Sequence, residues 1–289
     1  MNAINDFFKD IAEFREFVPG ISALIEFKEL NSSAIHARKQ IRSIIGADLW
    51  KKIQEESEKD SETRLYLMNA FGNLIMHKAL IFGVVAFRLS GKADVYKHEI
   101  ETMKRQYIDN YFNAMDSLIE VLTTDEKYTE LWKKTTYSKL TEKLQIKTTT
   151  EFDSLYGIDM SYLFFYRTAT LQREVLFEGI SDTFAKAATR EDLTDKLKLA
   201  LAQLVISLAL LRFDFTELPG TIRSLFNEQK ASRSGTNEQR RNITLAADLR
   251  HNAMAIVNAV ELALSEPSGS NVVSNTSVNR EDDKFYAIM

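Results

Sequence analysis

The sequence predicts a mainly α-helical protein made of two tandem, related helical units, and three observations support this. Only 3 prolines and 10 glycines occur in 289 residues, which favours long helices over a β fold with many turns. The hydrophobic content of 45% and the charged content of 27% are typical of a globular protein with a substantial core. Apolar residues recur at helical spacing, and one such pattern occurs twice.

Residues 1–31 form a predicted N-terminal segment. Its apolar residues fall at helical spacing, namely Ile4, Phe7, Phe8, Ile11 and Phe14. We expect this segment to pack either on its own domain or on a neighbouring subunit. It lacks the basic region, apolar centre and cleavage site of a signal peptide, so synthesis in the cytoplasm is expected.

The first predicted helical unit covers residues 32–122. It contains an opening helix over 32–53, a long apolar helix over 62–91 and a third helix over 96–122. The middle helix carries the most apolar stretch of the chain, "ALIFGVVAFRLSG" (79–91). A membrane span needs roughly 20 consecutive apolar residues, and this stretch is shorter. We interpret it as a helix surrounded by protein and expect no membrane partner.

Residues 123–160 form a predicted linker that is rich in Thr and Lys. Within it Leu144, Ile146, Thr148 and Thr150 alternate with polar residues in the way that a short strand does. We therefore expect the linker to contain a brief β element, either one extended segment or a hairpin.

The second predicted unit covers residues 161–265 and repeats the pattern of the first. Glu191–Gly220 aligns without a gap on Glu62–Gly91, so that Leu211 falls on Phe82 and both are expected in the core. Each copy ends at a glycine, which suits a helix C-terminus. Residues 238–264 likewise align on residues 96–122. The alternative is that two amphipathic helices resemble each other by chance.

Residues 266–289 have the polar composition of an extended C-terminal arm. The arm ends in an aromatic and apolar stretch. Its end is either incidental or a segment that docks on another subunit, as peptides bind in grooves. The candidate docking residues are Lys284, Phe285, Tyr286, Ile288 and Met289.

No catalytic, cofactor-binding or metal-binding residues are predicted, and the chain is not expected to be an enzyme. It has no cysteine, which excludes disulfides and thiolate chemistry. Phosphate-binding loops and nucleophile elbows are missing from the sequence. Its four histidines lack the spacing of a metal site: His36, His77, His98 and His251. A run of carboxylates is predicted to be solvated surface: Glu55, Glu56, Glu58 and Asp60.

Basic residues lie near the starts of the two corresponding third helices. They are Lys104 and Arg105 in the first copy and Arg240 and Arg241 in the second. The net charge of −4 gives no overall basic field. The four cations are either ordinary helix surface or contacts to the phosphate backbone of DNA in a channel.

The two units resemble the helical head–tail connector (adaptor or ring) proteins of tailed bacteriophages, above all the two-unit forms of crAss-like phages of Bacteroidetes. The resemblance covers most of residues 32–265 and is carried by "IIGADLWKKI", "LMNAFGNLIMHKALIFGVVAFRL" and "TTTEFDSLYGIDMSYLFFYRT". It implies a structural virion protein, made in the host cytoplasm, that forms a homo-oligomeric ring of typically twelve subunits. Such a ring contacts the portal protein and adjacent tail or ring proteins, and genomic DNA passes through it without sequence specificity.

A second hypothesis follows from the helical units alone. Stacked helices form grooves that recognise peptides. The alternative function is therefore a soluble helical scaffold or binding module that recognises a protein partner.

Overall fold

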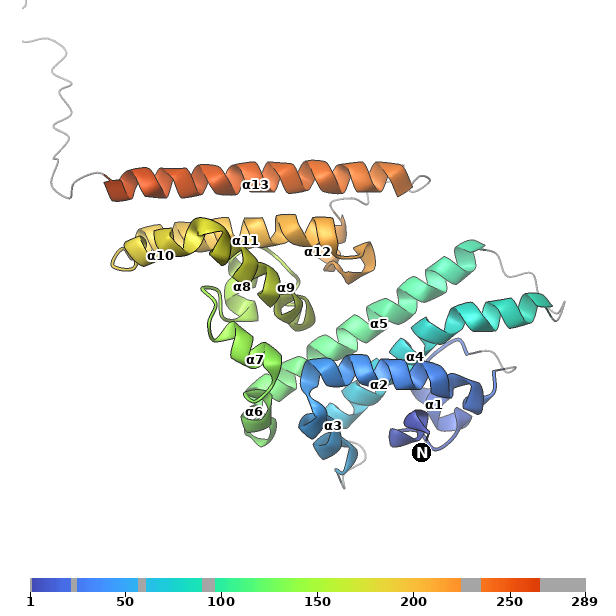
Figure 1. The fold of residues 1–289 in the computed structure, drawn as a ribbon. Helices are drawn as coiled ribbons and strands as arrows, with labels where there is room; N and C mark the ends of the chain where they lie inside the picture. The colour runs from blue at the N-terminus through green and yellow to red at the C-terminus, as the bar shows by residue number, and fades with distance from the viewer. Residues whose placement is uncertain (1, 22–24, 57–60, 90–96, 225–234, 266–289) are drawn as a thin grey trace, which may run out of the picture.

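The computed structural model describes residues 2–21, 25–56, 61–89, 97–224 and 235–265, and these ranges are mainly helical without a strand (Figure 1). The predicted α class is confirmed. Two pairs of long helices dominate the molecule, α4 with α5 and α11 with α13, and shorter helices join them. The predicted C-terminal arm lies outside the described residues.

The N-terminal segment packs against its own chain. It consists of η1 (Ala3–Asp6), α1 (Ile11–Phe17) and η2 (Phe27–Leu30). Phe8 and Phe14 are almost fully buried, and both Phe7 and Phe8 make ring contacts with Phe71 of α4. Of the two predicted locations, the structure therefore shows packing on the same domain.

The first unit contains α2 (Asn31–Ile45), α3 (Ala47–Gln54), α4 (Glu62–Leu89) and α5 (Lys97–Thr124). Gly46 separates α2 from α3 at φ 86°, a backbone conformation that glycine adopts without steric cost. The first half of α4 is buried nearly all round, as Leu74, Ile75 and Met76 show. For residues 62–80 this confirms the interpretation of α4 as a helix surrounded by protein. The side chains of residues 81–89, including Phe82, lie outside the described part.

The predicted β element in the linker is wrong. Residues 123–160 form three short helices, α6 (Glu126–Trp132), α7 (Thr136–Thr141) and α8 (Thr149–Leu155). Thr148 Oγ1 accepts a hydrogen bond from the N–H of Glu151 and so caps α8, a position that suits Thr better than a helix interior. Leu144 and Ile146 lie in the turn before α8, and both side chains are buried. The alternation of apolar and polar residues therefore arises from a turn and not from a strand.

The second unit begins with α9 (Tyr162–Val175), the π-helical turn η3 (Leu176–Ile180) and α10 (Ser181–Ala187). It continues with α11 (Glu191–Arg212), η4 (Phe215–Glu217), α12 (Gly220–Ser224) and α13 (Gly235–Ser265). The opening helix, the middle helix and the outer helix follow in the same order as in the first unit. The copying of one unit within the gene stays a prediction.

The predicted helix over 191–220 ends eight residues early, at Arg212. Phe213 is extended, and the carboxylate of Asp214 accepts a hydrogen bond from the N–H of Thr216 at 2.9 Å, which forms a turn. Gly220 starts α12 instead of ending α11. Leu211, predicted in the core, is 53% exposed, so the alignment with the first unit does not hold at this end of the helix.

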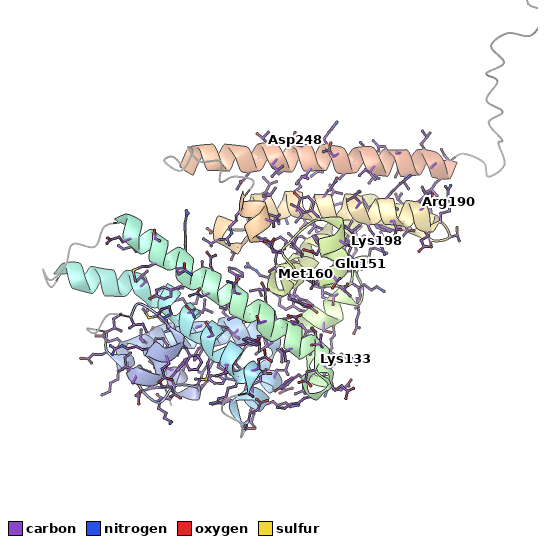
Figure 2. The ribbon with its side chains drawn as sticks, turned by 180° about the vertical axis from the view of Figure 1, so that it is seen from behind. Lys133, Glu151, Met160, Arg190, Lys198 and Asp248 are labelled. Carbon is purple, nitrogen blue, oxygen red and sulfur yellow. The ribbon has the colours of Figure 1, made fainter. Side chains whose placement is uncertain are left out.

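The outer helix α13 rests mainly on α11 (Figure 1). Ala246, Ala253 and Val257 are buried on that side, and Ser207 Oγ of α11 donates a hydrogen bond to the carbonyl oxygen of Ala246 at 2.7 Å. Asp248 lies on the opposite, outward side (Figure 2). Only one side of α13 is covered. Three large apolar side chains on the rest of the helix are therefore exposed: Ile243, Met254 and Leu262.

Ion pairs connect the linker and the two units. Lys198 Nζ of α11 lies 2.7 Å from Glu151 Oε1 of α8, and Figure 2 shows the two side chains side by side. Arg223 of α12 lies 2.8 Å from Asp109 of α5. Polar contacts of this kind orient the second unit on the first.

Candidate anion-binding surface

A hollow of about 650 Å³ lies between α2, α4 and α5. We call it the basic hollow because His and Lys side chains from all three helices line it. A second hollow of about 440 Å³ shares part of this lining and extends toward η4. The residues that line the basic hollow are Ser32, Ser33, His36, Lys39, Gln40, Ser43, His77, Lys78 and Lys104.

Helix periodicity places the α2 residues along one face. His36, Lys39 and Ser43 are three and four residues apart, a spacing that stacks side chains on successive turns. The core face of the same helix carries Ala37 and Ile41, which are fully buried. The hydroxyl and cationic groups of α2 therefore form one wall of the hollow.

Three lysines bring positive charge to the basic hollow. No carboxylate among the described residues lies within ion-pair distance of Lys39, Lys78 or Lys104. Burial lowers the pKa of Lys78, because a partly desolvated ammonium group is less stable than a hydrated one. An anion bound in the hollow would offset this cost.

His77 lines the hollow and connects α4 to α5. Its Nδ1 donates a hydrogen bond to the backbone carbonyl of Lys104 at 3.2 Å. Burial lowers the pKa of His77, although this hydrogen bond acts in the opposite direction. The His77 ring is therefore neutral at pH 7 and leaves Nε2 as an acceptor.

The second hollow has mixed charge. Arg105 lines it together with Asp214 and Glu217. Hydrogen bonds from Thr216 lower the pKa of Asp214, so its carboxylate is ionised at neutral pH, and Glu217 pairs with Arg167 at 2.9 Å. Lys78 and Lys104 line both hollows, and the lining of the basic hollow itself contains no carboxylate.

The structure brings together only part of the predicted basic set. Lys104 lines both hollows, and Arg105 lines the second one. That either residue faces DNA stays a prediction. Arg240 and Arg241 belong to α13, but their side chains lie outside the described part. The predicted docking residues lie outside the described residues altogether: Lys284, Phe285, Tyr286, Ile288 and Met289.

Sequence reasoning missed Lys39 and Lys78 as members of this site. Lys78 directly precedes the apolar stretch 79–91 of the middle helix and marks only where that stretch begins. The spacing of His36, Lys39 and Ser43 on the opening helix could have indicated a polar surface, since it places the three side chains on one face. The convergence of three helices at one point requires the tertiary fold.

The prediction that the carboxylate run is solvated is wrong for Glu56, whose side chain is only 7% exposed. It accepts hydrogen bonds from Ser61 at 2.6 Å and from the Tyr128 hydroxyl, and it pairs with Lys127 at 2.8 Å. Burial alone would raise the pKa of Glu56, but these partners lower it. Glu56 thus connects the end of α3 to α6. Glu58 and Asp60 lie outside the described residues.

In the described ranges no three His, Asp or Glu side chains are grouped to hold a metal ion. Within the same ranges, none of the helices is both long and apolar enough to span a bilayer. Comparisons with protein-family models, with characterised proteins and with solved structures gave no match. The function proposed below therefore rests on the residues of this chain.

Proposed function

We propose that the protein is a structural subunit of the head–tail connector of a tailed bacteriophage, where copies form a ring and DNA passes along it. The observation that supports this best is the basic hollow, in which Lys39, Lys78 and Lys104 converge without a carboxylate partner among the described residues. Phosphate groups are the ligands that such a cluster suits. The resemblance of residues 32–265 to connector proteins supplies the biological setting.

The composition of the hollow suits contact with DNA without sequence recognition. Lysine acts as a point charge on a flexible stem, whereas bidentate base recognition needs Arg, Asn or Gln in fixed geometry. The lining contains lysines and serine hydroxyls, which contact phosphate oxygens. DNA that slides through a connector requires contacts of this kind, because a sequence-specific grip would hold it in one register.

The outer surface of the second unit supports the self-association part of the proposal. Apolar Ile243, Met254 and Leu262 are exposed on α13, and Leu211 is exposed on α11. A second copy of the chain packed against α13 would remove its apolar side chains from water. A ring needs two different, complementary surfaces on each subunit, and α13 would supply one of them.

Electron microscopy and native mass spectrometry of the full-length chain test the proposal, with and without a short DNA duplex. Closed rings of one defined subunit number are expected. A chain that stays monomeric at high concentration, with DNA and with a co-expressed portal protein, would contradict it.

A specific observation also favours the alternative function, a soluble scaffold that recognises a protein partner. Phe177 is 77% exposed at the π-helical turn η3, and exposed aromatic side chains are common at protein-binding surfaces. The alternative predicts a monomer or dimer with one dominant protein partner and with no measurable affinity for DNA. The ring measurement above therefore distinguishes the two functions.

A further inference from the structure

A groove of about 710 Å³ lies between the linker and the second unit, away from the basic hollow. It is formed by α7, by the residues that follow α7, and by the turn from α9 through η3 into α10. We call it the α7–η3 groove. Its lining combines apolar side chains, Leu140, Leu176 and Phe177, with the cations Lys139, Lys143 and Arg173.

The π-helical turn explains why an aromatic ring is exposed in this groove. Gly179 has φ 131° and interrupts the helix between α9 and α10. A residue with a side chain is strained at this φ, so the turn depends on glycine. Phe177 lies within the turn and is 77% exposed, and the guanidinium of Arg173 lies 5.4 Å from the centre of its ring.

The cations of the groove lack acidic partners in the described part of the chain. No described carboxylate lies within ion-pair distance of Lys139, Lys143 or Arg173, and Asp182 is the one acidic residue in the lining. The groove therefore suits a peptide that carries carboxylates next to aromatic or aliphatic side chains.

Residues 281–289, "EDDKFYAIM", have this composition. Glu281, Asp282 and Asp283 are followed closely by Phe285, Tyr286, Ile288 and Met289. The internal segments outside the described residues lack it: residues 225–234, "LFNEQKASRS", carry Leu and Phe but more cations than carboxylates, and 57–60 and 90–96 carry no run of acids next to aromatic residues.

The end of α13 lies near the groove. Asp182 lines the groove, and the next residue, Thr183, donates a hydrogen bond from Oγ1 to Glu261 at 3.0 Å. Helix α13 ends four residues later, at Ser265. From there to Glu281 the chain can span at most about 55 Å, at 3.3–3.6 Å per residue. The chain is therefore long enough for segment 281–289 to reach the groove of its own chain, where tethering would give it a high effective concentration.

We propose that residues 281–289 bind in the α7–η3 groove of the same chain, with the acidic residues on Lys139 and Lys143 and the aromatic residues on Phe177. This inference does not depend on the connector function, because it concerns a contact within one chain. Docking of the segment on another copy is the competing arrangement.

Disulfide cross-linking tests the proposal cleanly, since the chain has no cysteine. The full-length double variant Gln145→Cys, Ala287→Cys places one thiol in the groove and one in the segment. Mild oxidation is expected to give a cross-linked monomer, detected by intact mass and gel mobility. Asp248→Cys combined with Ala287→Cys is the control, since Asp248 lies on the outward side of α13 (Figure 2). The same tether can bring residue 287 to this position, so the control reports random encounter and should cross-link much more slowly.

A mixture of the two single variants, Gln145→Cys and Ala287→Cys, separates the two arrangements. No cross-linked dimer is expected from it. The proposal would be overturned, in favour of docking on another copy, if the mixture gave a cross-linked dimer and the double variant gave no cross-linked monomer. No cross-link in either sample would overturn both.

Charge reversal tests the recognition itself. In the cross-linking variant, Lys139→Glu with Lys143→Glu should slow cross-linking roughly tenfold. Adding Glu281→Lys, Asp282→Lys and Asp283→Lys should restore the rate. Lys134→Glu with Lys186→Glu is the matched control, because both lysines are exposed outside the groove. A rate that is insensitive to the groove lysines, or that is not restored, would contradict the proposed contact.

Discussion

The carboxylate of Asp116 on α5 accepts a hydrogen bond from the backbone N–H of Leu163, in the first turn of α9, at 2.7 Å. It also accepts one from Ser161 Oγ at 3.2 Å. Asp116 thereby connects the first unit to the start of the second. Burial raises the pKa of Asp116 to about 6, which outweighs the opposing effect of these hydrogen bonds.

This pKa predicts how stability changes with pH. An ordinary aspartate with a pKa of 3.8 releases its proton first in the unfolded chain. Between pH 4 and 6 the folded protein therefore binds more protons, and this contribution to stability falls as the pH rises. The difference in free energy of unfolding between wild type and Asp116→Asn, measured by urea titration, should fall by about 2 kcal/mol over this range. A constant difference would show that Asp116 titrates normally.

Gly72 predicts a sharp response to a small substitution. A Cβ atom at this position of α4 would lie 2.5 Å from Val18 Cγ2 and 3.4 Å from Phe8 Cζ. Overpacking costs about 1–3 kcal/mol, and alanine recovers part of it through its higher helix propensity. Gly72→Ala should therefore lower the free energy of unfolding by about 1–2 kcal/mol. At Gly157 the nearest atom is 4.0 Å away, and Gly157→Ala should have little effect.

Two neighbouring leucines distinguish the structure from the gap-free alignment of the two units. Leu210 is 3% exposed and Leu211 is 53% exposed. Leu210→Ala should cost about 2–5 kcal/mol of stability, and Leu211→Ala should change it by less than about 0.5 kcal/mol. Chemical denaturation of both variants measures this. A larger loss at Leu211 would support the aligned register over the structure.

The basic hollow predicts the salt dependence of DNA binding. Substitution of Lys39, Lys78 and Lys104 by Gln should weaken binding to duplexes of any sequence. The slope of log affinity against log salt should fall by about 0.9 for each phosphate that the variant no longer neutralises. Fluorescence anisotropy at several salt concentrations provides both quantities. The same change at Lys134, Lys186 and Lys196, which are exposed elsewhere, is the control; an equal weakening there would argue against the hollow.

The helical periodicity of the sequence predicted most of the fold. The predicted helices over 62–91 and 96–122 correspond to α4 (Glu62–Leu89) and α5 (Lys97–Thr124), because long apolar faces override local signals. The strand near Leu144 was wrong because alternation over a few residues also arises in a turn that buries two side chains. A Thr148-x-x-Glu151 capping pattern was present and favoured a helix start.

The candidate site was less predictable than the fold. Lys39, Lys78 and Lys104 lie on three helices far apart in sequence, and only packing brings them together. Glu56 was misjudged for a related reason. Because Glu56 is charged, it was predicted to be exposed to solvent. Lys127 and Tyr128, more than 70 residues away in the sequence, bind its carboxylate and allow it to be buried.

The one-sided attachment of α13 has a consequence for its dynamics. Because this helix rests mainly on α11, it can separate transiently while the aromatic residues around Phe71 stay packed. Local opening of this kind makes amide hydrogens exchange faster than those of the fully enclosed half of α4. Any molecule that binds the outward side of α13 and stabilises it would slow that exchange. The exchange rate of the α13 amides therefore measures the binding of a partner to this helix.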